Sequence, residues 1–364
     1  MGRDGRSEKG AVTPRDDRPL VALTMGDVAG VGPEVIARAW GESPLRTLAR
    51  PFVIGSRPVL ERALACVGVL ASVEPIARPE DAHPSARVIP LLEATEVDAA
   101  SIPPGRVDPR AGRAAYDFLI TAIDLALAGR IDALTTLPLH KEALHAAGIV
   151  HPGHTEILAE RCGVTDHAMM LYVGPPVGAN DAGLGVLHVT LHVALRRALD
   201  LITEEAVELK INLADRALRP LTSGRPPRVA VAGLNPHAGE GGLFGDEEAR
   251  IIAPAIARGR AAGIDVVGPI AADTLFVRAL AGEFDAVIAM YHDQGHVALK
   301  TVGFDRAVNV TLGLPIVRTS VAHGTAFDIA WHGRAETSSL IEAVRVAARL
   351  VSGRRPSGLT MASP

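Results

Sequence analysis

Three histidines each follow an aliphatic run by only a few residues, a placement that could assemble a metal site. His192 ends GVLHVTLH, His237 follows VAVAGLNP and His292 follows AVIAMY. A neutral imidazole is the commonest protein ligand for a metal ion, and three imidazoles with one open position form a known catalytic arrangement. A single histidine beside a core is more often structural. Three at equivalent positions predict a shared divalent metal site that suits zinc best, with magnesium, cobalt, manganese or nickel as alternatives.

A fourth histidine, His296, lies four residues after His292, as two ligands on one helix would. Gly295 lies between them and is unfavourable inside a helix, so we expect neither a continuous helix nor a paired site here. Asp293 is then expected to accept a proton from the substrate or to support His292.

Three residues late in the chain could hold an anion. Lys300 ends the segment that begins at His292, Asn309 lies in VNVTLG, and Arg318 opens RTSVAHGTAFD. Most lysines and arginines are solvated at the surface, but these interrupt very apolar sequence. Two cations and an amide donor on neighbouring loops predict a phosphate site.

Short aliphatic runs alternate with longer amphipathic segments, which is typical of an α/β protein with buried parallel strands. We expect strands at 20–24, 51–54, 133–136, 185–190, 228–232, 265–267, 286–290 and 307–311. We expect helices at 113–128, 193–219 and 247–262. Ligands bind beyond the carboxyl ends of strands in such sheets, which is where the histidines lie. The glycine-rich MGDVAGVGPE (25–34) matches neither common nucleotide-binding glycine motif, so it predicts only a tight strand-to-helix turn.

The composition bounds the class of protein. Its 364 residues are 48% hydrophobic and 21% charged, which is enough for two α/β lobes with aliphatic cores. The net charge of −4 gives no basis for binding nucleic acid or an anionic membrane, and no apolar run reaches the ~18 residues of a membrane span. Cys66 and Cys162 form no ligand pattern and suit a reducing cytoplasm. We assign residues 19–140 and 318–352 to a first lobe, 141–317 to a second lobe with the metal and substrate residues, and 1–18 and 353–364 to disordered tails.

The chain resembles the PdxA family, the 4-hydroxythreonine-4-phosphate dehydrogenases, from about residue 19 to residue 350. The segments that carry the resemblance are MGDVAGVGPE, PGHTE, NPHAGEGG, ADTLF, YHDQG and NVTLGLPIVRTSVAHGTAFD. The resemblance implies a homodimeric dehydrogenase that uses NAD and a divalent metal. It also implies a two-lobed fold similar to that of isocitrate and isopropylmalate dehydrogenases, with an active site in the interlobe cleft that is completed across the dimer.

The resemblance also assigns individual residues by position. It makes metal ligands of the three histidines named above, His192, His237 and His292. It assigns substrate binding to His154, Thr155, Lys300, Asn309 and Arg318. HGTAFDIA is similar to the segment that holds the adenosine half of the cofactor in isopropylmalate dehydrogenases, which assigns Gly324 and Asp328 to the cofactor. Lys141, Lys300 or Asp293 is expected to accept the proton of the substrate.

Four positions depart from the family pattern. Val28 replaces a proline, Trp331 replaces a glycine, His296 replaces an apolar residue, and His140 stands where asparagine is common. The resemblance therefore implies the type of reaction more firmly than the substrate.

The implied reaction oxidises and decarboxylates 4-phosphohydroxy-L-threonine to 3-amino-2-oxopropyl phosphate for pyridoxal phosphate synthesis. The alternative substrate is D-threonate or D-erythronate 4-phosphate, which would give dihydroxyacetone phosphate. A cis-dihydrodiol carboxylate dehydrogenase would need no phosphate site, and a metal-dependent hydrolase would need no nucleotide. The expected cofactor is NAD, with NADP as the alternative.

Overall fold

The computed structural model describes residues 16–151, 153–175 and 183–354. Apart from residues 16–18, 353 and 354, the two predicted tails lie outside these residues. Within them, no helix is long and apolar enough to cross a membrane.

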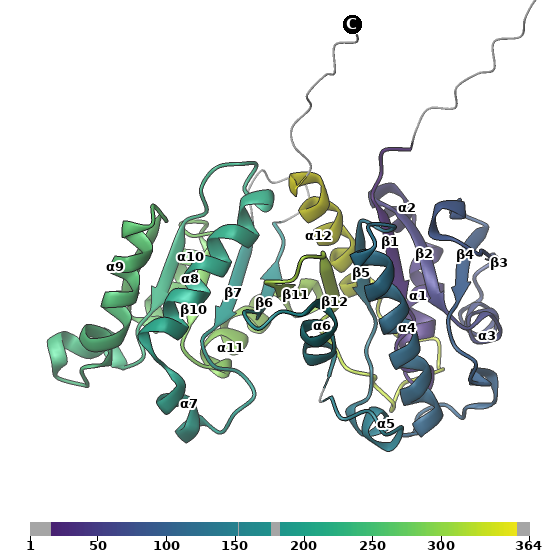
Figure 1. Cartoon of the computed structure of the whole chain (residues 1–364), viewed down its shortest axis with the longest axis horizontal. Coiled ribbons are helices and arrows are strands. Elements are labelled where there is room, and N and C mark those ends of the chain that lie inside the picture. The colour runs from purple at the N-terminus through teal and green to yellow at the C-terminus, as the bar shows by residue number, and fades with distance from the viewer. Residues whose placement is uncertain (1–15, 152, 176–182, 355–364) are drawn as a thin grey trace, which may run out of the picture.

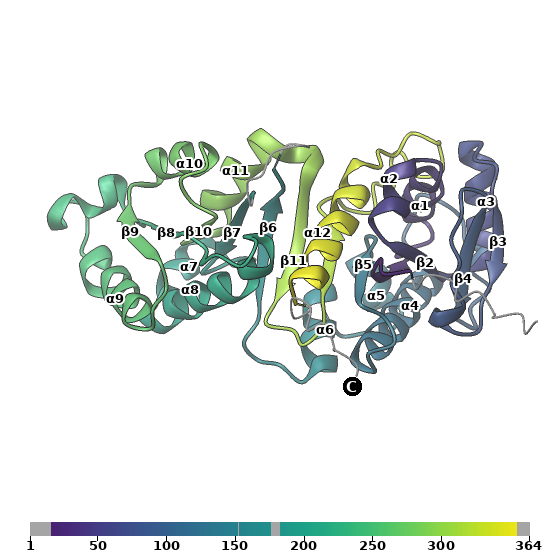
Figure 2. The ribbon, with the colours of Figure 1, turned by 90° about the horizontal axis from the view of Figure 1, so that it is seen from above.

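A single mixed sheet runs through the described chain from one end to the other (Figures 1 and 2). Its strands are β1 (Leu20–Thr24), β2 (Arg50–Gly55), β3 (Ser72–Pro75), β4 (Val88–Glu93), β5 (Ala133–Thr136), β6 (Ala168–Val173), β7 (Leu184–His188), β8 (Val229–Ala232), β9 (Val266–Ile270), β10 (Ala286–Ala289), β11 (Ala307–Leu312) and β12 (Arg318–Val321). Their order is β3-β4-β2-β1-β5-β12-β11-β6-β7-β10-β8-β9. The α/β class predicted from the alternating pattern is confirmed.

Helices cover both faces of this sheet (Figure 2). They are α1 (Gly32–Trp40), α2 (Ser43–Leu48), α3 (Arg57–Val67), α4 (Pro109–Leu127), α5 (Lys141–Ala146), α6 (His154–Cys162), α7 (Leu195–Leu201), α8 (Glu204–Leu218), α9 (Ala253–Ala261), α10 (Ala272–Leu280), α11 (His292–Gly303) and α12 (Ser338–Arg354). In one half of the molecule α8 and α9 lie on one face, and α10 and α11 lie on the other. In the other half α4 packs on β1, β2 and β5, while α12 packs on β5, β12 and β11.

The centre of the sheet departs from the expected parallel arrangement. β12 pairs parallel to β5 but antiparallel to β11, and β6 is antiparallel to both β11 and β7. The three central strands therefore join two parallel half-sheets through an antiparallel segment. On one side of this segment, β3, β4, β2, β1 and β5 form the sheet of one half of the molecule, and on the other side β7, β10, β8 and β9 form that of the second half (Figure 1).

Two helix expectations are wrong in detail. The helix expected at 193–219 is two helices, because Thr203 interrupts it and its hydroxyl caps α8 by accepting from the backbone N–H of Ala206 at 3.2 Å. The helix break expected at Gly295 does not occur, since α11 runs through this glycine. The four strands β3, β4, β6 and β12 were not expected from the sequence.

The proposed division into lobes stays a prediction. The boundary at residue 141 places α5 and α6 in the second lobe, although both of them pack against α4. The strands β11 and β12 are hydrogen-bonded neighbours and lie on opposite sides of the proposed boundary at residue 318.

Candidate active site

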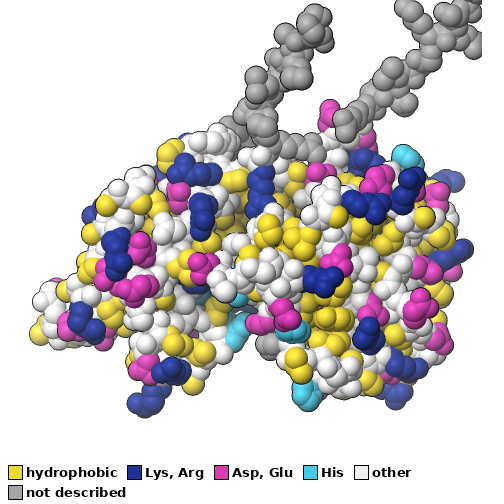
Figure 3. Space-filling model, viewed as in Figure 1, with side chains coloured by type: hydrophobic (Ala, Val, Ile, Leu, Met, Phe, Trp, Pro, Cys, Tyr) yellow, Lys and Arg dark blue, Asp and Glu magenta, His cyan; other side chains and the backbone are white. Residues whose placement is uncertain are grey.

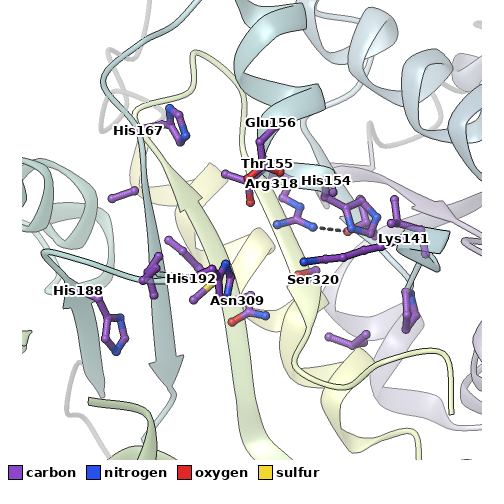
Figure 4. Close-up of a pocket in the computed structure, with 18 of the residues that line it drawn as sticks. Lys141, His154, Thr155, Glu156, His167, His188, His192, Asn309, Arg318 and Ser320 are labelled. Atoms are coloured by element: carbon purple, nitrogen blue, oxygen red, sulfur yellow. Dashed lines mark hydrogen bonds between the residues drawn. The ribbon is translucent and has the colours of Figure 1, made fainter. Parts of the chain in front are cut away.

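A cavity of about 470 Å³ lies over the central strands and the adjoining helices (Figure 4). Polar side chains reach it from β5, β12, β11 and β7, from the start of α5 and α6, and from α8. Those that could bind or act on a ligand are Thr136, Lys141, His154, Thr155, Glu156, His167, His188, His192, Lys210, Asn309, Arg318, Ser320 and His323. Several residues singled out in the sequence therefore converge from distant segments.

Arg318 is the most buried cation of this cavity. It opens β12, is only 4% exposed, and donates from Nη1 to Thr311 Oγ1 at 2.9 Å and from Nη2 to Thr136 Oγ1 at 2.7 Å. None of the ion pairs among the described residues includes this guanidinium, and its Nε has no hydrogen-bond partner there. Burial lowers the pKa of Arg318 from 12.5 to about 9, so it remains a cation at neutral pH. An anion in the cavity would supply the missing counter-charge.

The N-terminus of α6 faces the same space. The helix begins at His154 after Gly153, with no side chain capping it, and His154 and Thr155 line the cavity. Unpaired N–H groups and the helix dipole favour an anion at such an end. Burial and the neighbouring Arg318 lower the pKa of His154 well below 6.5, so its imidazole is neutral and adds no charge.

Asn309 and Lys141 add a hydrogen-bonding amide and a second cationic side chain. The Oδ1 atom of Asn309 on β11 is buried without a partner among the described residues, which leaves it available to a ligand. The Lys141 side chain starts α5 and extends into the cavity toward Ser320 on β12 (Figure 4). The two cations therefore approach the cavity from different elements.

Lys210 is a cavity residue that the sequence did not reveal. It lies on α8, and its Nζ donates to the backbone carbonyl of His167 at 3.3 Å. Burial lowers the pKa of Lys210. Its helix carries many charged residues, so in the sequence this lysine is indistinguishable from a solvent-exposed one. Thr136 and Ser320 were missed for a similar reason, because small hydroxyl residues give no signal.

Two of the three predicted metal ligands lie together beside this cavity. The ring centroids of His192 and His292 are 5.8 Å apart, and both residues line a second hollow of about 390 Å³ next to Asp293. Asp293 Oδ1 is 2.6 Å from Nδ1 of His292, which orients the ring and leaves Nε2 as the free ligand atom. Burial, Lys141 and His292 lower the pKa of His192, which keeps it in the neutral form that binds metals.

A buried histidine pair supports His292 from behind. His188 is 1% and His296 is 7% exposed, and Nδ1 of His296 lies 3.1 Å from Nε2 of His188. The His296 ring stacks on that of His292 at 3.9 Å with an interplanar angle of 8°. Burial, together with the neighbouring imidazoles, lowers the pKa of His188 to about 3 and that of His296 to about 4, so both are neutral. A Cβ on Gly295 would lie 2.4 Å from His188 Nε2, so this position of the helix has room only for glycine.

His237 does not join this group in one chain. It is exposed, its nearest aromatic neighbour is Phe244 at 6.2 Å, and the five residues 237–241 all have positive φ. Such a left-handed turn is rare and persists only where its surroundings hold it. Glu248 anchors the residues just before this turn by accepting from the backbone N–H groups of Leu234 and Asn235. Among the described residues, no three His, Cys, Asp or Glu side chains are arranged to hold a metal ion.

A separate cavity of about 240 Å³ lies between Lys300 of α11, Val31 of the glycine-rich turn and the segment that follows β12. Lys300 lines this cavity, not the one that contains Arg318. Gly324 and Asp328 are exposed on the adjoining segment. The glycine-rich turn at 25–34 packs against that segment: Val31 N donates to Thr325 O at 3.0 Å, and a Cβ on Gly30 would lie 2.8 Å from the same oxygen.

Comparison with known proteins identifies the family. The family model described as "Pyridoxal phosphate biosynthetic protein PdxA" matches residues 47–347. The chain belongs to the PdxA family. It is 50% identical over 335 residues to the 4-hydroxythreonine-4-phosphate dehydrogenase of Beijerinckia indica, covering 92% of this chain and 95% of that one. It is 46% identical over 332 residues to the D-threonate 4-phosphate dehydrogenase of Salmonella typhimurium, covering 91% and 98%.

A solved PdxA-family structure shares the fold. The crystal structure of 4-hydroxythreonine-4-phosphate dehydrogenase from Klebsiella pneumoniae superposes with a TM-score of 0.82 at 44% identity, covering 92% of this chain and 99% of that one. Of the positions matched to the PdxA family from the sequence, one cavity gathers His154, Thr155, His192, Asn309 and Arg318. Lys300, His237 and His292 lie outside its lining.

Proposed function

We propose that this chain is an NAD-dependent, divalent-metal-dependent dehydrogenase that oxidises and decarboxylates 4-phosphohydroxy-L-threonine to 3-amino-2-oxopropyl phosphate. The observation that carries the proposal is the cavity in which Arg318, the α6 N-terminus, Asn309, Lys141 and His192 meet. A phosphate, a hydroxyl and a carboxylate on one small molecule would each find a complementary group there.

The phosphate is assigned to Arg318 and the N-terminus of α6. Arg318 is a buried cation that pairs with no carboxylate of the described residues, and the first turn of α6 offers N–H groups beside it. Thr155 adds a hydroxyl donor at the same helix end. Lys300 would reach this phosphate only from the neighbouring cavity, which it lines. Asn309, whose Oδ1 has no partner in the described part of the chain, is assigned to a donor group of the substrate.

The metal is assigned to His192 and His292, with His237 as the third ligand. The imidazole of His292, held by Asp293 and His296, and the imidazole of His192 fit a zinc ion, and cobalt, nickel, manganese or magnesium are the alternatives. His237 is exposed and apart from these two, which suits a site completed by a second copy of the chain. When bound, the metal would supply Lewis-acid stabilisation of negative charge on the substrate oxygens.

The nicotinamide cofactor is assigned to the segment at 322–333 and the cavity beside it. Val31, Ala322, Ala326, Ile329 and Ala335 give that cavity an apolar wall that suits an adenine ring. Its polar residues include Lys300, Asp305, Arg334 and Glu336, which suit the ribose and phosphates of NAD, with NADP as the alternative. Gly324 and Asp328 lie on the exposed side of the segment. The cofactor would supply the hydride acceptor.

Lys141 is the residue best placed to take the hydroxyl proton. Its amine extends into the cavity that contains Arg318, whereas Asp293 is engaged by His292 and lines a different hollow. The proton would move from the substrate hydroxyl to Nζ of Lys141 when that amine is neutral.

We further propose that the enzyme is a cytoplasmic homodimer. Val193, Leu195 and Leu199 on and before α7 are 43%, 60% and 50% exposed, and the first two line the hollow that contains His192 and His292. Figure 3 shows histidine side chains at the surface where the two halves of the molecule meet. An exposed apolar helix beside an incomplete metal site is what a second copy would cover. Both described cysteines are free, which suits a reducing compartment.

The test is an NADH-production screen with divalent metal on three substrates: 4-phosphohydroxy-L-threonine, D-threonate or D-erythronate 4-phosphate, and a cis-dihydrodiol carboxylate. The first substrate is expected to give the highest kcat/KM. A higher value for the sugar-acid phosphate would move the chain to that activity, which the Salmonella relative carries by name. Substrate consumption that forms no NADH and proceeds equally without nucleotide would replace the dehydrogenase by a hydrolase.

A further inference from the structure

The segment that joins β12 to α12 contains a tryptophan in a backbone conformation that favours glycine. Trp331 has φ of +64°, in the left-handed region that bulky residues rarely adopt. In Figure 1 this yellow-green segment leaves β12 and passes α1 before it reaches α12. A residue keeps such a conformation only when its contacts outweigh the strain.

Three separate elements hold Trp331 in place. Its indole Nε1 donates to the backbone carbonyl of Val28, in the glycine-rich turn, at 3.1 Å. Its backbone N–H donates to the carboxylate of Glu34 on α1, which is fully buried and also accepts from the N–H of Gly333. On α3, the guanidinium carbon of Arg62 lies 3.8 Å from the centre of the indole ring.

Arg62 is held mainly by this ring contact. Its Nη1 donates to Ala100 O at 3.3 Å, while Nε and Nη2 are buried and have no hydrogen-bond partner among the described residues. Burial lowers the pKa of Arg62, and the face of an indole attracts a cation that has been taken out of water. The indole and the guanidinium therefore stabilise each other, and through this contact Arg62 packs on the segment 322–333, which contains Trp331 and is assigned to the cofactor.

We propose that Trp331 is a positioning residue that fixes the segment 322–333 against the glycine-rich turn, α1 and α3, so that the cofactor meets a segment already in its binding conformation. The inference rests on the proposed dehydrogenase function and goes beyond it, because it makes NAD affinity depend on side chains outside both cavities. A ligand that binds a preordered segment does not have to supply the free energy of ordering it. The glycine-rich turn thereby acts as a support for the cofactor segment, through Val28 and Val31, and needs no direct contact with phosphate.

The experiment is a calorimetric titration of NADH into the metal-loaded full chain and three variants: Trp331→Gly, Arg62→Met and the double substitution. Glycine is the residue best suited to φ of +64°, so Trp331→Gly is expected to fold. We expect it to raise the NADH Kd about tenfold. This corresponds to about 1.4 kcal/mol of binding free energy, which would then be consumed in ordering the segment. Arg62→Met should raise the Kd in the same direction, and the double variant should be no weaker than Trp331→Gly alone, because both act through one contact.

Kinetics and a matched control separate positioning from general damage. The KM for NAD should rise in Trp331→Gly, while kcat and the KM for the phosphorylated substrate stay as they are, since Trp331 lines neither cavity. The control is Trp40→Phe, which alters the protein's other tryptophan, a fully buried residue of α1. It should lower the melting temperature without changing the NADH Kd.

Three results would overturn the inference. An unchanged NADH Kd in Trp331→Gly, beside normal binding by the unaltered chain, would remove the positioning role and leave the dehydrogenase proposal intact. An equal rise in the KM of both substrates would mean that the tryptophan supports the fold in general. Failure of the unaltered chain to bind any NADH would refute the proposed function itself, and with it this inference.

Discussion

Replacing Arg318 by methionine should separate substrate affinity from stability. Methionine keeps much of the length and apolar volume of the side chain but removes the charge. The present guanidinium is 4% exposed, has two threonine hydroxyls as partners and takes part in none of the described ion pairs. The positive charge of Arg318 is therefore buried with no counter-charge from the described residues, which destabilises the folded protein when no anionic ligand is bound.

The size of both effects follows from this environment. The fall in the pKa of Arg318 from 12.5 to about 9 corresponds to at most about 5 kcal/mol against the charged form. Removing the charge also removes two charge-assisted hydrogen bonds to threonine, each of about 1.5–3 kcal/mol, so the free energy of unfolding should rise by no more than about 2 kcal/mol. A charge-assisted hydrogen bond to phosphate contributes about 1.5–3 kcal/mol, so the KM for a phosphorylated substrate should rise about 10- to 150-fold.

The assay compares steady-state kinetics and thermal unfolding of Arg318→Met with those of Arg349→Met. Arg349 is also partly buried and hydrogen-bonded, to Tyr172 Oη and Leu221 O, but it lies outside the cavity. The control should leave the KM unchanged. An unphosphorylated substrate analogue should be affected equally little by both variants. An unchanged KM for the phosphorylated substrate in Arg318→Met would remove the phosphate from this residue.

Three further predictions concern other parts of the structure. Burial raises the pKa of Asp27 from 3.8 to about 6, so ionisation destabilises the fold as pH rises through this window; Asp27→Asn should add about 1–3 kcal/mol at pH 8 and little at pH 4, and an equal gain in urea unfolding at both pH values would contradict this. Gly295→Ala should displace His188 and lower the free energy of unfolding by about 1–3 kcal/mol, whereas a rise in melting temperature would show that the close approach is absent. His237→Ala should lose bound metal in elemental analysis while His167→Ala keeps it; full occupancy in the former would exclude His237 as a ligand.

The sequence predicted those parts of the fold that local patterns determine. β1 and β5 have the predicted ends, because their residues are buried runs of aliphatic side chains and threonine. β12 was missed because RTSV is short and mostly polar, although its residues are buried. Strand direction at β6 and β11 could not be read from composition, since it depends on how segments far apart in the chain meet.

The candidate site, like the fold, could be predicted from the sequence only where local patterns determine it. Arg318 and Asn309 were found because they stand in or next to apolar strands. The contact between His188 and His296 was not, because it joins residues 108 positions apart and depends on the missing Cβ of Gly295. Whether the exposed His237 and the pair His192 and His292 share an ion is a property of the assembly, which one chain does not determine.

The unbroken hydrogen-bond ladder from β5 through β12 and β11 to β6 limits how the two halves can move. A hinge built from loops would let them swing as separate bodies, but here any opening or closing has to be taken up as twist and bend of the strands themselves. Arg318 and Asn309 lie on those strands. Any bending of the strands that closes the cavity therefore also moves these two side chains. Cutting the chain between the halves would expose β11 or β12 as a bare edge, and each fragment alone would be prone to pair with another copy along it.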